Sequence, residues 1–159
     1  MKTSMEYARD AFKAVDNEKI YLFPGSCFSG EKRLSFHKMK KGYVLEFIDT
    51  EEQVDPILIE SEDQLAEELR YLIPCLEDTL DKKEFIWDEN IGDEDKEKIK
   101  KKIIEAIIEC DGSEYDYSVN EFRDEVKLMG RKYSFNLYCN VAATGYWYFG
   151  QEIYVKRIR

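Results

Sequence analysis

The chain has 159 residues and is 43% hydrophobic and 14% aromatic, which suffices for the core of about one domain. Its net charge of −10 repels phosphate groups, so the charge argues against a nucleic-acid or anionic-membrane surface. A basic protein partner is favoured instead, because opposite charges speed the encounter of two proteins. The same charge is equally compatible with a role in solubility alone.

The N-terminal sequence MKTSMEYARDAFKAV lacks the apolar segment of a secretion signal, and no run approaches the roughly 20 apolar residues of a membrane span. We therefore expect a cytoplasmic protein. The four cysteines are far apart in the sequence and form no Cys-x-x-Cys pair. Without an export signal, we expect reduced, mostly buried thiols at Cys27, Cys75, Cys110 and Cys139.

Apolar residues spaced as on one helical face predict a helix over residues 3–15, capped by Thr3 or Ser4. Short alternating segments between turn residues then predict a run of strands, at residues 20–23, 33–39, 43–48 and 57–59. A second helix begins at Ser61, with acidic residues in its first turn. Pro74 predicts that this helix kinks or ends near residues 71–73, because proline lacks the N–H of a helical hydrogen bond.

The pattern becomes less regular after this helix. Residues 77–92 predict an irregular acidic segment with an apolar group at Phe85, Ile86 and Trp87. The stretch DEDKEKIKKKIIEAIIEC then has acids at its start and an isoleucine stripe, as expected of an amphipathic helix. The last part of the chain alternates apolar and polar residues, which predicts strands at residues 132–141 and 146–158.

Residues 118–129 fit two structures. Ser118 and Glu121 form a capping-box pattern, and the apolar residues that follow suit a helix. The same residues before Gly130 and Arg131 suit a β-hairpin equally well. We favour a hairpin over residues 125–138.

Segregated runs of strands and helices indicate an α+β fold, with antiparallel sheet or sheets packed against about three helices. We expect one α+β domain over residues 1–159. Its possible sub-halves are residues 1–76 and 93–159, joined by the irregular acidic segment.

Catalytic signatures are absent from the sequence. His37 is the only histidine, and no nucleophile or orienting carboxylate stands near it in the chain, so we interpret it as a structural or surface residue. The cysteines and the histidine lack zinc-ligand spacing, and the acidic loops fail the EF-hand pattern at its twelfth position. No nucleotide-binding, P-loop, nucleophile-elbow or zinc-protease motif occurs. We expect no enzymatic activity, no catalytic residue, no metal and no cofactor.

Negative charge is concentrated in three zones. Residues 49–63, DTEEQVDPILIESED, hold seven carboxylates and no base, and two further zones begin near Asp88 and Asp111. Residues 127–159, by contrast, hold six bases and one acid. Some acids are accounted for by helix starts or by pairing with these bases. As clusters interleaved with aromatic residues, they instead resemble an interface with aromatic anchors and a charged surround.

The sequence Tyr146-Trp147-Tyr148-Phe149 also has two interpretations. In a strand, Tyr146 and Tyr148 share one face, and Trp147 and Phe149 share the other. Either both faces are buried between sheet and helices, or one forms an exposed adhesive patch. Burial is the favoured interpretation, because monomers rarely expose such patches.

Residues 42–72, GYVLEFIDTEEQVDPILIESEDQLAEELRYL, combine an aromatic strand, an acidic turn, a strand and a capped helix rich in Leu and Ala. This pattern resembles small acidic bacterial immunity proteins of polymorphic toxin systems. The resemblance implies a cytoplasmic α+β protein that binds a toxin domain and blocks its active site or substrate access.

The leading hypothesis is therefore an immunity-type protein that neutralises a basic bacterial toxin, such as a nuclease, by occluding its active site. The candidate partner-binding residues are Glu51, Glu52, Asp55, Trp87, Asp88, Glu89, Asp111, Glu114, Tyr115, Asp116 and Tyr117. A phage-type acidic mimic of nucleic acid that inhibits a nuclease is an alternative, and it would need charges spaced like phosphates along one face. An enzyme of unrecognised class is another, and it would need a cleft with His37 or a carboxylate pair of strongly shifted pKa.

Overall fold

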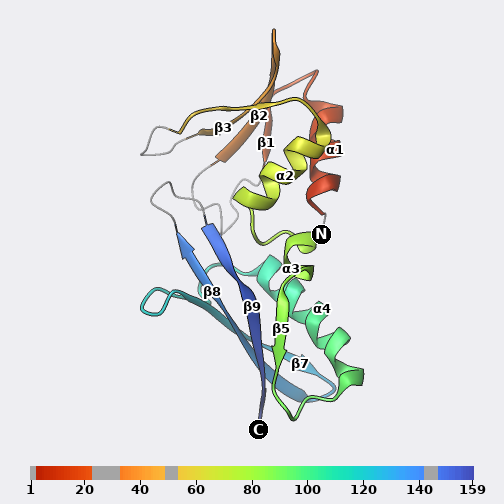
Figure 1. Ribbon diagram of the computed structural model, residues 1–159, viewed down its shortest axis with the longest axis vertical. Coiled ribbons are helices and arrows are strands. Elements are labelled where there is room, and N and C mark those ends of the chain that lie inside the picture. Colours follow the sequence, from red (N-terminus) through yellow and green to blue (C-terminus); the bar gives the residue numbers. More distant parts are fainter. Residues whose placement is uncertain (1–2, 23–32, 49–53, 142–146) are drawn as a thin grey trace.

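The computed structural model describes residues 3–22, 33–48, 54–141 and 147–159. Its first part forms a four-stranded antiparallel sheet in the order β1-β2-β3-β4, with two helices on one face (Figure 1). The elements of this part are α1 (Ser4–Ala14), β1 (Ile20–Leu22), β2 (Arg33–Met39), β3 (Gly42–Ile48), β4 (Ile57–Ile59) and α2 (Glu62–Leu72).

The second part of the chain forms a five-stranded sheet in the order β5-β9-β8-β7-β6. Its strands pair antiparallel except for β5, which runs parallel to β9. The elements here are α3 (Glu77–Asp81), β5 (Glu84–Trp87), α4 (Asp93–Glu109), β6 (Tyr115–Asp116), β7 (Glu121–Leu128), β8 (Arg131–Val141) and β9 (Trp147–Ile158). In Figure 1 the two sheets lie at opposite ends of the long axis, with α3 between them.

Local sequence explains where the helices begin and end. The Thr3 hydroxyl accepts from the Glu6 N–H, and the Glu6 carboxylate accepts from the Thr3 N–H, a complete capping box at the start of α1. The Ser61 side chain caps α2 through the Gln64 N–H. As Pro74 predicted, α2 ends at Leu72.

Each sheet buries one face against helices. In the first sheet the Phe12 ring of α1 lies 5.1 Å from the Phe36 ring and 4.7 Å from the Tyr43 ring. In the second, α4 buries the predicted isoleucine stripe, at Ile99, Ile103, Ile104 and Ile107. Phe122, Leu137 and Ile153 form a buried row across β7, β8 and β9.

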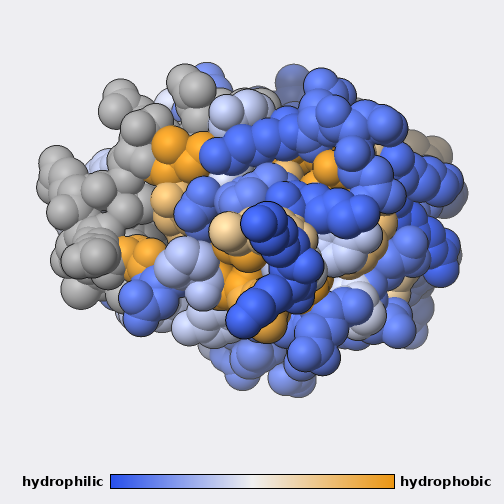
Figure 2. Space-filling model, turned by 90° about the horizontal axis from the view of Figure 1, so that it is seen from above, coloured by the Kyte–Doolittle hydropathy of each residue, from blue (hydrophilic) through white to orange (hydrophobic). Residues whose placement is uncertain are grey.

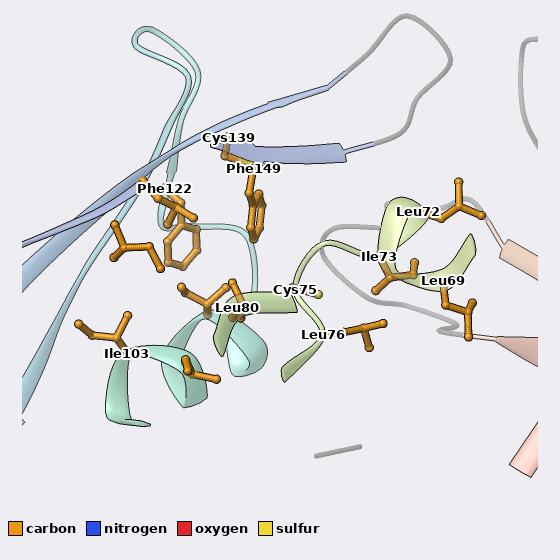
Figure 3. Packing of buried hydrophobic residues seen from close by; sticks show 14 of the residues in the cluster. Leu69, Leu72, Ile73, Cys75, Leu76, Leu80, Ile103, Phe122, Cys139 and Phe149 are labelled. Carbon is orange, nitrogen blue, oxygen red and sulfur yellow. The ribbon is translucent and has the colours of Figure 1, made fainter. Parts of the chain in front are cut away.

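One continuous hydrophobic cluster joins the two sheets. Figure 3 shows Cys75, Leu76 and Leu80 between Leu69 and Leu72 of α2 on one side and the residues of the second sheet on the other. Leu76 and Leu80 are 1% and 0% exposed, so the connection between the sheets is itself core. Cys75 and Cys139 are buried and Cys110 is half-buried, whereas Cys27 lies outside the described residues.

The α+β fold with mostly antiparallel sheets is confirmed, with four helices among the described residues where about three were expected. The hairpin predicted over residues 125–138 is also confirmed, as β7 and β8. Leu128 pairs with Arg131 across the two-residue turn Met129-Gly130, whose φ angles of 51° and 76° are those of a primed hairpin turn.

The prediction of an irregular segment over residues 77–92 is wrong. This segment contains α3 and β5, and Phe85 pairs with Ile153 in the middle of β9. Four residues of β5 carry no clear alternation of burial, and their partner strand comes much later in the chain. The local pattern therefore could not reveal the parallel pairing.

No helix of the described residues is long and apolar enough to cross a membrane. Figure 2 shows the end of the molecule that carries the four-stranded sheet. Hydrophilic residues cover most of this view, and hydrophobic residues form only small separate areas between them. Scattered apolar residues of this kind are normal on a protein surface.

The Asp78 carboxylate of α3 connects three helices. Its Oδ1 accepts from the Ser4 N–H at 3.1 Å, and its Oδ2 accepts from the Ser4 hydroxyl at 2.6 Å and from Arg70 Nε at 3.0 Å. Ser4 is the first residue of α1 and is fully buried, and Arg70 belongs to α2. Burial raises the pKa of Asp78, but the hydrogen bonds from Ser4 and Arg70 outweigh burial and hold this pKa below its usual value.

We expect Asp78→Asn to lower the free energy of unfolding by about 2 kcal/mol at pH 7, because hydrogen bonds to a charged group contribute about 1.5–3 kcal/mol. A carboxyl whose pKa is lower in the folded chain stabilises the fold at a pH above its unfolded pKa of about 3.9. This stabilisation is lost as the pH falls through the pKa of the folded chain. The difference between the wild type and Asp78→Asn should therefore shrink below pH 4.

Urea unfolding at pH 7 and pH 3 measures this difference. Glu77→Gln is the matched control, since Glu77 is exposed on the same short helix and should change the stability little at either pH. A difference between wild type and Asp78→Asn that persists unchanged at pH 3 would contradict the assigned role of the charge.

Candidate interaction surface

An aromatic cluster stands at the β6 edge of the second sheet. The Tyr115 ring contacts the Tyr117 ring at 4.4 Å and the Trp147 ring at 5.1 Å, both edge-on at 83° and 84°. The Tyr115 hydroxyl also donates to Asn120 Oδ1 at 3.1 Å. Tyr115 is thus fixed between its neighbours, whereas Tyr117 is 77% exposed. We call Tyr115, Tyr117 and Trp147 the aromatic cluster.

Two carboxylates beside this cluster are held in their ionised form by their own loop. Hydrogen bonds from the Ser113 side chain and from the Ser113 N–H, which donates to Asp111 Oδ1 at 2.9 Å, lower the pKa of Asp111. The Ser118 hydroxyl and N–H donate to Asp116 Oδ1 at 2.6 and 2.9 Å and lower the pKa of Asp116. These bonds are typical of Asx turns, so both acids have a local structural role and also keep a full negative charge at the surface.

Glu114 completes this group of acids. Its backbone carbonyl accepts from the Arg123 N–H at 2.9 Å, which anchors the loop to β7. One carboxylate oxygen, Oε2, is buried and accepts no hydrogen bond within the described part of the chain. Five of the predicted site residues, Asp111, Glu114, Tyr115, Asp116 and Tyr117, are therefore brought together in one short segment.

The other predicted anchor lies at the opposite edge of the same sheet. Trp87 ends β5, where its ring stacks on Phe85 at 5.5 Å and lies under the Lys96 ammonium at 5.9 Å. Asp88 and Glu89 follow it in a turn, with Asp88 half-buried and Glu89 exposed. Because β5 and β6 are separated by three strands, these two candidate groups are about 19 Å apart.

The remaining predicted residues belong to the other sheet. Asp55 is exposed just before β4. Glu51 and Glu52 lie outside the described residues. The structure thus joins the candidates around Tyr117, but it brings neither the Trp87 group nor Asp55 to them.

A row of tyrosines, which the sequence analysis did not select, lies on the face of the second sheet opposite α4. Tyr138, Tyr148 and Tyr154 are 43%, 44% and 41% exposed. Asn140 Nδ2 donates to the hydroxyls of Tyr138 and Tyr148 at 3.0 and 3.2 Å. The alternation of residues within the predicted strands could have placed these tyrosines on one face. For Tyr148 the sequence analysis favoured burial, but the structure shows it partly exposed. Phe149, on the other face, is buried.

The surroundings of His37 bear on the alternative of an enzyme. Its Nδ1 lies 3.9 Å from Glu46 Oε1 and makes no hydrogen bond within the described residues. Among the described residues, the aspartates with a shifted pKa are Asp78, Asp93, Asp111 and Asp116, and the pKa of each is lowered. A general acid at neutral pH needs a raised carboxyl pKa. No group of three or more potential metal ligands occurs among the described residues.

Comparison with known proteins gives no relative. No protein-family model matches the chain, and neither a curated protein nor a solved structure matches it.

The aromatic cluster generates a prediction about stability. Tyr115→Ala should lower the free energy of unfolding by about 2 kcal/mol, because it removes two ring contacts and a hydrogen bond. Tyr117→Ala should cost about 1 kcal/mol or less, since one edge-on contact is lost from an exposed ring. Urea unfolding of both variants checks this, and equal losses would show that Tyr117 is as structural as Tyr115.

Proposed function

We propose that this protein is an immunity-type binding protein that neutralises a basic bacterial toxin by occluding its active site. The observation that carries the proposal is the Tyr117 ring, which is largely exposed and stands beside carboxylates held ionised by their own loop. The resemblance of residues 42–72 to small bacterial immunity proteins supports the same class of function.

The chemistry of the cluster suits an arginine or lysine side chain of the partner. A cation can stack on the face of the Tyr117 ring, which is worth about 0.5–2 kcal/mol, while Asp116 accepts its hydrogen bonds. Tyr115, which is itself packed against Trp147, contacts the Tyr117 ring edge-on and restricts it, so less conformational entropy is lost when the partner binds. Exposed aromatic residues fixed in this way are typical hot spots of protein interfaces.

The net charge contributes at longer range. A charge of −10 attracts a basic protein before contact and raises the association rate, and added salt weakens this attraction. A nucleic-acid mimic would need its charges in a row along one face. The described acidic groups near Asp88 and Asp111 instead lie at opposite edges of a sheet, which favours an aromatic anchor over mimicry of phosphates.

The proposal is tested by capturing partners with tagged protein from lysate of the source cells, at low and then high salt. The site variant combines Asp111→Asn, Asp116→Asn and Tyr117→Ala. The matched control combines Glu67→Gln, Glu68→Gln and Tyr71→Ala, which changes the same charge and removes a 70% exposed tyrosine from α2.

We expect one basic partner that the wild type and the control retain at low salt. The site variant should bind this partner at least about 30-fold more weakly, as measured by calorimetry, because a hot spot contributes about 2 kcal/mol or more. A partner that binds both triple variants equally would place the interface elsewhere. Failure to find any basic partner would contradict the proposed function.

A further inference from the structure

A groove of about 610 Å³ runs between the start of α1, the short helix α3 and the part of α4 that follows its first turn. In Figure 1 the N-terminal end of α1 lies beside α3, and α3 lies beside this part of α4. The residues of α4 that line the groove extend from Glu97 to Glu109, a length of about 18 Å. The groove is therefore as long as about three turns of a helix.

The floor of the groove is apolar and its walls are acidic. The apolar surface comes from Ile108, which is half-buried, and from the edge of Ile104, which is 8% exposed and lies one turn before it on α4. Six carboxylates and two lysines line the walls, at Glu77, Asp78, Asp81, Glu97, Glu105, Glu109, Lys100 and Lys101. This combination of an apolar floor and charged walls fits a segment that is itself apolar on one side and charged on the other.

One of the two lysines of the groove is already engaged. Lys100 Nζ lies 3.0 Å from Asp81 Oδ1 and 5.4 Å from the centre of the Phe85 ring. The carboxylate of Asp78 is likewise engaged by Ser4 and Arg70. Within the described residues, no ion pair involves the four exposed glutamates of the groove, Glu77, Glu97, Glu105 and Glu109.

The position of two of these glutamates opposes the helix dipole. Glu105 and Glu109 stand near the C-terminal end of α4, whose last turn contains no base. Carboxylates at this end are unfavourable, because the helix carbonyls already give it partial negative charge. A bound cation reduces the repulsion of these carboxylates by the helix carbonyls and by one another. Binding of a cation therefore accounts for this placement of the acids, which folding alone does not explain.

We propose that this groove binds a lysine- or arginine-rich amphipathic helix of a protein partner. The apolar side of that helix packs on Ile104 and Ile108, and its basic side pairs with Glu97, Glu105 and Glu109. Helix-in-groove recognition of this kind needs apolar anchors spaced one turn apart, and Ile104 and Ile108 provide the matching surface. The site does not involve Tyr117, so it can be tested independently of the proposed function.

The probe is a synthetic 12-residue amphipathic helix of leucine and lysine with a fluorescent label, and anisotropy at 50 and 500 mM salt measures its binding. The groove variant combines Glu97→Gln, Glu105→Gln and Glu109→Gln. The control combines Glu67→Gln, Glu84→Gln and Glu125→Gln, three exposed glutamates outside the groove. A peptide of the same composition with its leucines and lysines scrambled, and free spermine, are the comparison ligands.

We expect the groove variant to bind the peptide about tenfold or more weakly, while the control and Tyr117→Ala bind it as the wild type does. Ile108→Ala should also weaken binding, and should do so at both salt concentrations. Equal losses in the groove variant and the control would show that only net charge matters and would overturn the proposal. It would also be overturned if the scrambled peptide bound as tightly, or if spermine at equal concentration displaced the peptide completely.

Discussion

The arrangement of the helices depends on one carboxylate. Asp78 binds the first residue of α1 and the last part of α2, and α3 positions it because Leu76 and Leu80 are buried between the two sheets. The same short helix therefore closes the hydrophobic core and fixes three helix ends. Burial of a carboxylate is unfavourable unless hydrogen-bond donors compensate its charge. Every contact described for the half-buried Asp78 carboxylate comes from such a donor. Residues of α3 also form one wall of the groove beside α4.

The negative charge of the chain has several structural uses at once. Acids begin α2, α3 and α4, where the helix dipole favours them. Asp111 and Asp116 order their own turns and remain ionised in doing so. Glu105 and Glu109 have no such use, and they oppose the dipole of α4. Local structure therefore explains much of the charge of the described residues, but it does not explain the acids at the end of α4.

Local signals were sufficient for most of the fold. Capping residues located α1 and α2, alternation located the strands of the hairpin from β7 to β8, and the isoleucine stripe located α4. The parallel pairing of β5, the contacts of Asp78 and the distance between Trp87 and Tyr115 are tertiary, and no local pattern encodes them. For the candidate site, the segment around Tyr117 could be found because its acids and aromatics are adjacent in sequence. The contribution of Trp147 could not be found in this way, because Trp147 belongs to β9, which follows the β7–β8 hairpin in the chain.

The parallel strand β5 has a consequence for the order of folding. Glu84 pairs with Glu152, 68 residues later in the chain, whereas the strands of the first sheet find their partners among residues 20–59. At a synthesis rate of about 5–20 residues per second, β5 waits about 3–14 s for its partner. During that interval the apolar residues Phe85, Ile86 and Trp87 have no strand beside them on the ribosome. The second sheet therefore cannot be completed at its β5 edge until the chain has been synthesised almost to residue 159.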